Sequence, residues 1–348
     1  MTGRLYLDWN ATAPLRPEAR AAMAAAMDVV GNPSSVHAEG RVAKGLLERA
    51  RAQVAAALGA EGADIIFTSG ATEAAALACA DLELQCAAIE HDAVLGWCAA
   101  VLPVDSDGRV QVADPGRTAL QLANSETGVL QTLPQGIAVT DLTQAFGKVP
   151  LAFNWLGAKA ALVSAHKLGG PKGIGAVVLQ RGQNRIPQLR GGGQEMGRRA
   201  GTENLIGIAA FGAAAEASQR DLANGVWDEV AEVRNILEQA LSPAELGTNL
   251  VGNTVARLPN TTCLMAPGWK GETQVMAMDL AGFAISAGSA CSSGKVRASR
   301  VLGAMGFDAG LAAQAVRISI GPGVCRDDVL RFADAWSAGY AKVRARAA

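Results

Sequence analysis

The tetrapeptide Ser164-Ala165-His166-Lys167 stands between an apolar run, residues 160–163, and the glycine-rich segment Gly169-Gly170-Pro171-Lys172-Gly173. A buried strand that ends in a loop can keep a lysine away from water, lower its pKa and make its amine available for Schiff-base chemistry. A solvent-exposed lysine in a turn is the more common situation when such a residue is considered alone. The interpretation of Lys167 therefore depends on what the rest of the chain places beside it.

The composition excludes several classes of protein. The 348 residues carry a formal net charge of −1, which leaves no basic surface for nucleic acid or an anionic membrane. No apolar run reaches the roughly 18 residues of a membrane-spanning helix. The first residues lack the pattern of a signal peptide, so we expect a cytoplasmic protein. Six scattered cysteines without metal-type pairs predict free thiols in a reducing compartment and no metal site.

Predicted strands and helices alternate along much of the chain, and strand after strand ends in a polar side chain. An open, mostly parallel α/β sheet brings such groups together beyond the carboxyl ends of its strands, where α/β proteins bind ligands. The expected strands cover residues 65–68, 87–89, 118–123, 137–140 and 160–163, and the expected helices cover 19–29, 39–58, 74–80, 204–223 and 226–241.

The turn at Ser242-Pro243 marks the expected end of the large domain. Beyond it we expect a smaller domain of α+β type, with strands near residues 261–265 and 316–320. The predicted division has three parts: an N-terminal segment that packs with the small domain (residues 1–15), a large domain (residues 16–242) and the small C-terminal domain (residues 243–348).

A candidate anion-binding turn, Ser69-Gly70-Ala71-Thr72-Glu73, joins the strand over 65–68 to the helix over 74–80. Free backbone N–H groups and the positive end of the helix dipole would face a small anion there, such as a phosphate. The same residues also fit an ordinary capping box in which Thr72 is the helix cap. Both interpretations are open from this segment alone.

The polar residues at the strand ends together supply what pyridoxal phosphate requires. Its phosphate needs the anion-binding turn, and its aldehyde needs an amine such as that of Lys167. A carboxylate such as Asp141 would keep the pyridine nitrogen protonated, so that the ring withdraws electrons. Gln144 could hydrogen-bond the ring hydroxyl, and His91 could lie over the ring face. A histidine that only satisfies polar groups in a loop is the simpler interpretation of His91.

Several motifs occur in one order along nearly the whole chain. They are Leu7-Asp8-Trp9-Asn10-Ala11-Thr12, Gly31-Asn32-Pro33-Ser34-Ser35-Val36-His37, Phe67-Thr68-Ser69-Gly70-Ala71-Thr72-Glu73-Ala74, Glu90-His91, Ser164-Ala165-His166-Lys167, Gly169-Gly170-Pro171-Lys172-Gly173-Ile174-Gly175, Gly191-Gly192-Gly193-Gln194-Glu195, Arg199-Ala200-Gly201-Thr202-Glu203-Asn204 and Ser286-Ala287-Gly288-Ser289-Ala290-Cys291-Ser292-Ser293-Gly294. With these motifs the chain resembles the cysteine desulfurases, which are class V pyridoxal-phosphate enzymes of fold type I. The resemblance implies a mostly parallel central sheet flanked by helices, with a smaller α+β C-terminal domain.

The resemblance implies a role for each residue around the cofactor. Lys167 would form the Schiff base, and Asp141 would pair with the pyridinium nitrogen. Gln144 would contact the ring oxygen, while His91 would stack on the ring and shuttle protons. The phosphate would be held by Ala71, Thr72, Ser164, His166 and, from a second subunit, Thr202. The contact made by Thr202 implies a homodimer.

The resemblance also implies L-cysteine as the substrate. Arg317 matches the arginine that grips the substrate carboxylate, a task suited to a bidentate fork, and Asn10 and Ser125 belong to the same substrate site. Cys291 has glycine and serine on both sides, as expected for a thiol on a flexible loop that moves during the reaction and is not packed in the core. L-cysteine would become L-alanine, and a persulfide on Cys291 would pass its sulfur to an acceptor, such as an iron-sulfur scaffold protein.

The chain departs from the family pattern near the expected site. Ser125 stands where the family usually has asparagine, and only 15 positions separate Glu126 from Asp141, so the helix usual between those strands is absent or trimmed. Thr140 and Pro322 also replace the usual residues. These departures leave open a related pyridoxal-phosphate lyase or transaminase acting on another small amino acid, or a low-activity partner in sulfur assembly. The sulfur acceptor could serve iron-sulfur cluster assembly or the thiolation of RNA.

Overall fold

A five-stranded sheet forms the centre of the computed structural model, which describes residues 3–243, 246–288 and 298–347. Its strands, in spatial order, are β2 (Asp64–Thr68), β8 (Gly175–Leu179), β7 (Ala160–Ser164), β6 (Val139–Asp141) and β5 (Ala119–Gln121). β8 is antiparallel to both of its neighbours, whereas β7, β6 and β5 are parallel to one another. The expectation of a mostly parallel sheet is confirmed, since every strand except β8 points the same way.

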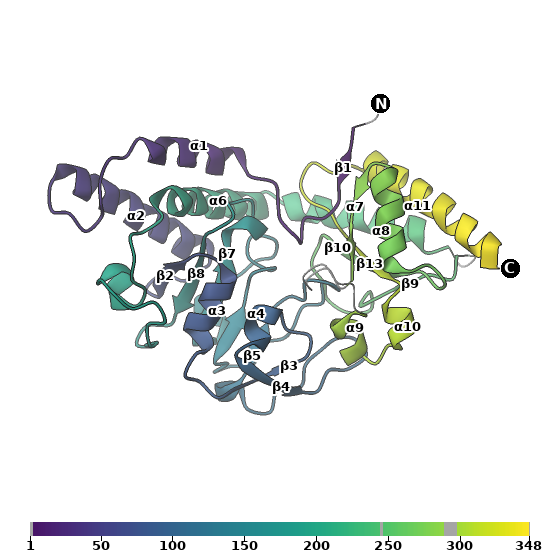
Figure 1. Cartoon of the computed structure of the whole chain (residues 1–348), viewed down its shortest axis with the longest axis horizontal. Helices are drawn as coiled ribbons and strands as arrows, with labels where there is room; N and C mark the ends of the chain where they lie inside the picture. The colour runs from purple at the N-terminus through teal and green to yellow at the C-terminus, as the bar shows by residue number, and fades with distance from the viewer. Residues whose placement is uncertain (1–2, 244–245, 289–297, 348) are drawn as a thin grey trace.

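Nearly all residues of these strands are buried, because helices cover both faces of the sheet. Along β2, Ile65 and Phe67 point to one face and Ile66 to the other, and all of these side chains are buried. The first face is covered by α2 (Ala38–Ala57) and α6 (Leu205–Ala223), with α1 (Pro17–Met27) packed on α6, and the second by α3 (Ala71–Cys79) (Figure 1).

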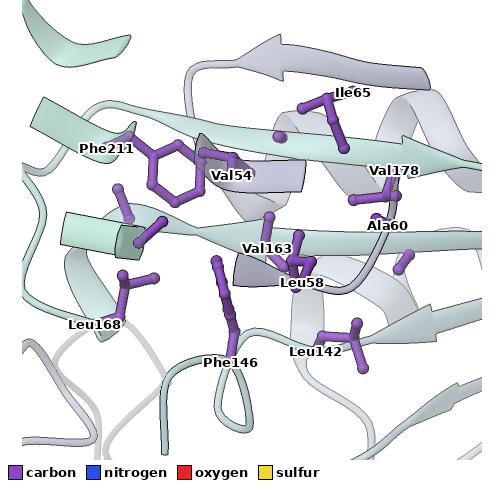
Figure 2. Close-up of a cluster of buried hydrophobic side chains, with 14 of the residues drawn as sticks. Val54, Leu58, Ala60, Ile65, Leu142, Phe146, Val163, Leu168, Val178 and Phe211 are labelled. Carbon is purple, nitrogen blue, oxygen red and sulfur yellow. The ribbon is translucent and has the colours of Figure 1, made fainter. Parts of the chain in front are cut away.

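The larger core of the chain lies between the sheet and helices α2 and α6 (Figure 2). Phe211 of α6 makes edge-to-face contacts with Phe67 and Phe146, with ring centroids 6.3 and 6.4 Å apart. Helix α6 approaches α2 closely because Gly212 faces Ala50, and a Cβ added to the glycine would lie 2.8 Å from the Ala50 Cα. The small residues of these helices therefore bring them into direct backbone contact.

A second, antiparallel sheet lies in the C-terminal part of the chain. Its strands, in spatial order, are β12 (Ser286–Ala287), β13 (Ala315–Ser319), β10 (Thr261–Met265) and β9 (Asn249–Leu250). Its apolar core includes side chains of α7 (Val226–Leu241), α8 (Gly271–Leu280) and α11 (Arg326–Ala347).

The N-terminal segment runs between these two parts of the molecule (Figure 1). Strand β1 (Leu5–Tyr6) pairs in parallel with β11 (Phe283–Ala284), and Leu7 is buried in the core of the C-terminal part. Trp227 and Leu241 of α7 belong to the same core. The division of the chain at Ser242 stays a prediction.

The remaining short helices and strands are α4 (Asp92–Leu95), α5 (Phe153–Leu156), α9 (Arg300–Ala304), α10 (Ala309–Ala312), β3 (Leu84–Ala87) and β4 (Cys98–Leu102). The described residues also contain 3₁₀ turns at Pro115–Arg117, Ala165–Lys167 and Gln194–Gly197. The strand expected over 87–89 is wrong in position, because β3 ends at Ala87 and pairs with β4 in a separate two-stranded sheet. Residues 122–138 contain no helix, as their short spacing predicted. Among all the helices described, none has both the length and the hydrophobicity needed to cross a bilayer.

Candidate active site

The carboxyl edge of the central sheet opens into a cavity of about 540 Å³. The cavity brings together most of the residues predicted from the sequence, namely Asn10, Ala71, Thr72, His91, Ser125, Asp141, Gln144, Ser164, His166, Lys167 and Arg317. Thr202 is exposed and lines a separate, smaller cavity of about 170 Å³. Cys291 lies outside the described residues.

Lys167 ends a short 3₁₀ turn that follows β7 directly. Its Nζ donates hydrogen bonds to the backbone oxygens of Asn10 and Ala11, at 2.6 and 2.9 Å. The chain reverses after this lysine because Gly169 has φ +90°, a left-handed conformation that favours glycine. The N-terminal segment therefore holds the amine at the edge of the sheet, and the glycine lets the chain turn away behind it.

Asp141 is the last residue of β6, and Gln144 lies three positions later in the turn that follows. Both residues line the same cavity. Burial raises the pKa of the Asp141 carboxyl, and hydrogen bonding by Thr143 and the positive charge of Lys167 oppose this shift. The backbone N–H of Thr143 donates to Asp141 Oδ1 at 2.8 Å. Gln144 Nε2 donates to the backbone oxygen of Asn10 at 2.9 Å. The carboxylate is thus held by a local backbone contact, and the amide by a backbone oxygen of the N-terminal segment.

Helix α3 begins directly after Gly70, and its first turn lines the cavity. The capping box with Thr72 as the cap is wrong, because Gly70 is the N-cap and Thr72 lies inside the first turn. Glu73 instead accepts a hydrogen bond from the backbone N–H of Ser69 at 2.7 Å and pairs with Arg199 at 2.8 Å. Free N–H groups at the start of a helix favour an anion, so this turn suits a phosphate.

Two histidines line the cavity, and they make different contacts. Burial, together with the positive charge of Lys167, lowers the pKa of His166 to about 4, so its imidazole is neutral at neutral pH. Nδ1 of His166 lies 3.2 Å from Thr12 Oγ1. His91 caps α4, with its Nδ1 accepting a hydrogen bond from the backbone N–H of Ala93 at 3.1 Å. His91 therefore satisfies a local polar group and also faces the cavity.

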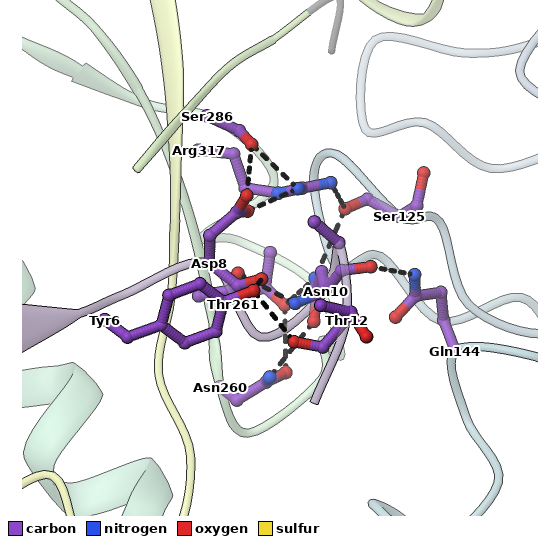
Figure 3. A network of polar contacts seen from close by, with 12 residues as sticks. Tyr6, Asp8, Asn10, Thr12, Ser125, Gln144, Asn260, Thr261, Ser286 and Arg317 are labelled. Atoms are coloured by element: carbon purple, nitrogen blue, oxygen red, sulfur yellow. Dashed lines mark hydrogen bonds and ion pairs between the residues drawn. The ribbon is translucent and has the colours of Figure 1, made fainter. Parts of the chain in front are cut away.

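Arg317 of β13 lines the cavity, and Figure 3 shows its contacts with Asp8, Ser125 and Ser286. Its side chain is buried, pairs with Asp8 at 2.7 Å and donates to the backbone oxygen of Ser125 at 3.1 Å. Asp8 also accepts a hydrogen bond from Ser286 Oγ at 2.8 Å. Arg317 Nε is buried and has no hydrogen-bond partner within the described ranges. Asp8 and Ser125 thus fix the orientation of the guanidinium, and its Nε–H donor has no partner among the described residues.

Comparison with known proteins places this geometry in a family. A profile of the aminotransferase class-V family matches residues 5–101 and 112–332, which make up most of the chain.

This chain belongs to the aminotransferase class-V family.

The class-V relatives that resemble this chain have similar lengths. A cysteine desulfurase of Cereibacter sphaeroides is 38% identical over 91% of this chain and 90% of that protein. A cysteine desulfurase of Frankia sp. is 37% identical over 98% of this chain and 92% of that protein. A crystal structure of a NifS-like protein from Rickettsia africae superposes with a TM-score of 0.86, at 31% identity, and covers 97% of this chain and 99% of that chain. The expected fold type is thereby confirmed.

Class-V aminotransferases depend on pyridoxal phosphate, and the residues of this cavity fit that group. The amine of Lys167 suits its aldehyde, the buried carboxylate of Asp141 suits its ring nitrogen, and the start of α3 suits its phosphate. All of these groups face one cavity of about 540 Å³, a size typical of ligand sites.

Two charged residues of this class-V site were not predicted from the sequence. Asp8 holds Arg317, although it lies 309 positions away along the chain. Lys148 donates to Gln144 Oε1 at 2.8 Å and is 2% exposed. The spacing of four positions between Gln144 and Lys148 is the one local signal that could have linked them.

Proposed function

We propose that this class-V protein is a cysteine desulfurase that uses pyridoxal phosphate to convert L-cysteine to L-alanine and passes the sulfur to an acceptor. The observation that carries the proposal is its 37 and 38% identity, over 91 to 98% of the chain, to proteins named cysteine desulfurase. The cavity supports it, because an amine, a buried carboxylate and a buried arginine surround one space.

We assign one side of the cavity to the cofactor. Lys167 would hold its aldehyde, Asp141 would keep the ring nitrogen protonated, and Gln144 would donate an N–H to the ring oxygen. His91 would cover the ring face. When bound, pyridoxal phosphate supplies an electron sink for charge that develops on the substrate carbon. The phosphate would be held by Ala71, Thr72, Ser164 and His166, together with Thr202 from a second copy of the chain.

We assign the opposite side to the substrate. Arg317 would bind the carboxylate of L-cysteine, with Asn10 and Ser125 beside it. Lys167 would take the proton from the substrate α-carbon. The thiolate of Cys291 would attack the substrate sulfur, so that a sulfur–sulfur bond forms as the carbon–sulfur bond breaks. The electron pair of the broken bond stays with carbon, which is protonated to give L-alanine, and Cys291 keeps a persulfide.

A homodimer and a sulfur acceptor are further parts of the proposal. Thr202 lies outside the cavity of its own chain, as a residue that acts in the site of a second copy would. An iron-sulfur scaffold protein or an enzyme that thiolates RNA would be a suitable acceptor, because both consume persulfide sulfur.

The test is an assay of sulfide and alanine from L-cysteine, with a reductant present. We expect the protein loaded with pyridoxal phosphate to release both products in equal amounts. Cys291→Ala should abolish sulfide release and keep the visible cofactor band, whereas Lys167→Ala should lose that band. Alanine and sulfide from Cys291→Ala at the unchanged rate would contradict the desulfurase proposal. An unchanged band in Lys167→Ala would contradict the cofactor assignment.

A further inference from the structure

Lys148 is a buried lysine beside the cavity to which the proposed function gives no task. It lies in the turn after β6, and its side chain is 2% exposed. Its Nζ donates to Gln144 Oε1 at 2.8 Å and to Asn10 Oδ1 at 2.9 Å. Both acceptors are neutral amide oxygens, so neither contact is an ion pair. A buried amine without an ion pair is costly, and the fold retains it next to two residues of the cavity.

Backbone carbonyls determine the orientation of the Asn10 side chain. Its Nδ2 donates to the backbone oxygen of Ser125 at 3.2 Å, and a carbonyl oxygen can only accept. Its Oδ1 therefore faces Lys148 and Asn260, whose nitrogens donate to it at 2.9 and 3.1 Å. Asn260 is oriented in turn by the backbone oxygen of Ile320, at 3.0 Å. The oxygen of Asn10 is thus fixed as the acceptor for Lys148.

The same reasoning orients Gln144. Its Nε2 donates to the backbone oxygen of Asn10 at 2.9 Å, so its Oε1 must point the other way. Lys148 supplies the donor that this buried oxygen needs. An amide nitrogen carries two N–H bonds, and Gln144 also lines the cavity. One N–H therefore binds the Asn10 oxygen, and the other is available to a ligand.

We propose that Lys148 is a positioning residue that holds Gln144 with its N–H donor directed at the ring oxygen of the cofactor. This inference rests on the proposed function, because the ring oxygen belongs to pyridoxal phosphate. Without Lys148 the buried oxygen of Gln144 would lose this donor, and the side chain could turn away from Asn10 and from the ring. Lys148 acts through Gln144 and is not itself a catalytic residue.

Asn10 also connects Lys148 to the lysine that would hold the cofactor. Its backbone oxygen accepts from Lys167 Nζ at 2.6 Å, and its side-chain oxygen accepts from Lys148. The titratable groups that influence Lys148 are Lys167, Arg317 and His166, all of them basic. Burial, together with the charges of Lys167 and Arg317, lowers the pKa of Lys148. The positive charges of Lys167 and Arg317 favour a negative charge on a ligand oxygen placed beside Gln144.

The first test replaces the lysine by a residue of similar length without a donor, Lys148→Met. We expect the affinity of the cofactor-free chain for pyridoxal phosphate to fall about tenfold, because a buried amide oxygen is left without a partner. We also expect the pH midpoint of the visible band of the loaded protein to rise, because the ring oxygen loses a donor that stabilises its charge. Lys159→Met, at a lysine that does not line the cavity, is the matched control and should change neither value.

The second test asks whether Lys148 acts through Gln144. Cofactor affinity is measured for Gln144→Met and for the variant that carries both substitutions. We expect the double variant to bind no more weakly than Gln144→Met, because the two residues form one unit. Should Lys148→Met not fold, Lys148→Gln is measured in the same cycle and judged by the same criterion.

Two results would overturn the proposal. One is additive losses of affinity, in which the double variant binds the cofactor about tenfold more weakly than Gln144→Met. The other is a Lys148 variant whose thermal stability falls while its cofactor affinity and band midpoint stay unchanged, which would indicate a structural role alone. These measurements do not depend on sulfide release. A wild-type protein that binds the cofactor but releases no sulfide would contradict the proposed function and leave the assignment of Lys148 intact.

Discussion

At the scale of single residues, the site depends on buried charges whose partners are distant in the sequence. The Arg317 side chain is 4% exposed and that of Asp8 17%, and their ion pair measures 2.7 Å. A buried arginine that loses its partner keeps an uncompensated charge, which costs more than the pair itself contributes. Asp8 therefore matters to the stability of the chain as well as to the orientation of Arg317.

We expect Asp8→Ala to lower the free energy of unfolding by about 3 kcal/mol, because Arg317 stays buried without its carboxylate. The measurement is urea denaturation followed by circular dichroism. Asp279→Ala is the matched control, since Asp279 pairs with Arg4 on the surface, and it should cost less than about 0.5 kcal/mol. Equal decreases in the free energy of unfolding for both variants would show that the burial of the Asp8–Arg317 pair does not contribute to stability.

Glu126 is a second residue with an unusual environment. Burial raises the pKa of its carboxyl to about 7, against the hydrogen bond from Ser299 and the charges of Arg317 and Arg300. Ser299 Oγ donates to Glu126 Oε2 at 2.5 Å and accepts from the backbone N–H of Leu302 at the start of α9. The folded chain therefore favours the protonated carboxyl, so this residue contributes most to stability at low pH.

We predict the pH dependence that follows for Glu126→Gln. The pKa is raised on folding from 4.5 to about 7, so the wild type loses stability as the pH rises through this range. The glutamine variant cannot ionise, and we expect it to be more stable than the wild type by about 3 kcal/mol at pH 8 and equally stable at pH 4. Denaturation at both pH values checks this. Glu83→Gln, at a carboxyl whose side chain is 93% exposed, should show no such difference.

At the scale of elements, the carboxylate of Glu195 accepts a hydrogen bond from the backbone of β2, at one edge of the central sheet. β2 is one of the two outer strands, and the backbone N–H of Phe67 donates to Glu195 Oε2 at 2.9 Å. Arg51 of α2 binds both oxygens of the same carboxylate, at 2.9 and 3.0 Å. Glu195 has φ +48°, a left-handed conformation unusual for a residue with a side chain. The motif around Glu195 thus joins a turn, a strand edge and a helix.

We expect Glu195→Ala to cost about 3 kcal/mol in the free energy of unfolding, because it leaves Arg51 and the N–H of Phe67 without their buried partner. Hydrogen exchange should also show faster exchange of the Phe67 amide. Glu48→Ala is the control, because Glu48 contacts the same arginine at 3.2 Å but is half exposed, and it should cost less than about 0.5 kcal/mol. Similar losses for the two variants would contradict this account of the sheet edge.

At the scale of the whole molecule, the N-terminal segment connects the two sheets through Asn10. The backbone N–H of Asn10 donates to Ser319 Oγ of β13 at 3.0 Å, and its backbone oxygen binds Gln144 and Lys167 of the other part of the chain. The side chain of Asn10 is buried, and its Nδ2 donates to Thr261 Oγ1 at 2.8 Å. The cavity therefore forms only when the N-terminal segment and both sheets are in place.

The proposed dimer leads to a prediction for the assembled molecule. Lys167→Ala and Thr202→Glu each alter the proposed cofactor site, the second by adding a negative charge near the phosphate. If Thr202 acts in the site of the other copy, a hybrid of the two variants holds one intact site. We therefore expect co-expressed, differently tagged variants to recover about a quarter of the wild-type activity. A mixture as inactive as the separate variants would show that Thr202 acts in its own chain or not at all.

Much of the fold was predictable because its determinants are local. Continuous apolar runs predicted β2 and β7, and the residues that follow them predicted the turn before α3 and the place of Lys167. The position of β3 was wrong, since its pairing with β4 outside the central sheet depends on neighbours rather than on its own apolar residues. The roles assigned to the individual site residues stay predictions.

The sequence by itself determined the positions of β2 and β7 along the chain, the polar residues that follow them and the family to which the chain belongs, because short segments encode each of these. It did not predict β8 or the spatial order of the strands in the sheet. Only the tertiary structure decided which charges are buried and what holds them. Asp8 meets Arg317 across 309 positions, and Lys148 meets Asn10 across 138. Such pairs leave no periodic pattern, because burial and hydrogen bonding depend on segments that become neighbours only when the chain folds.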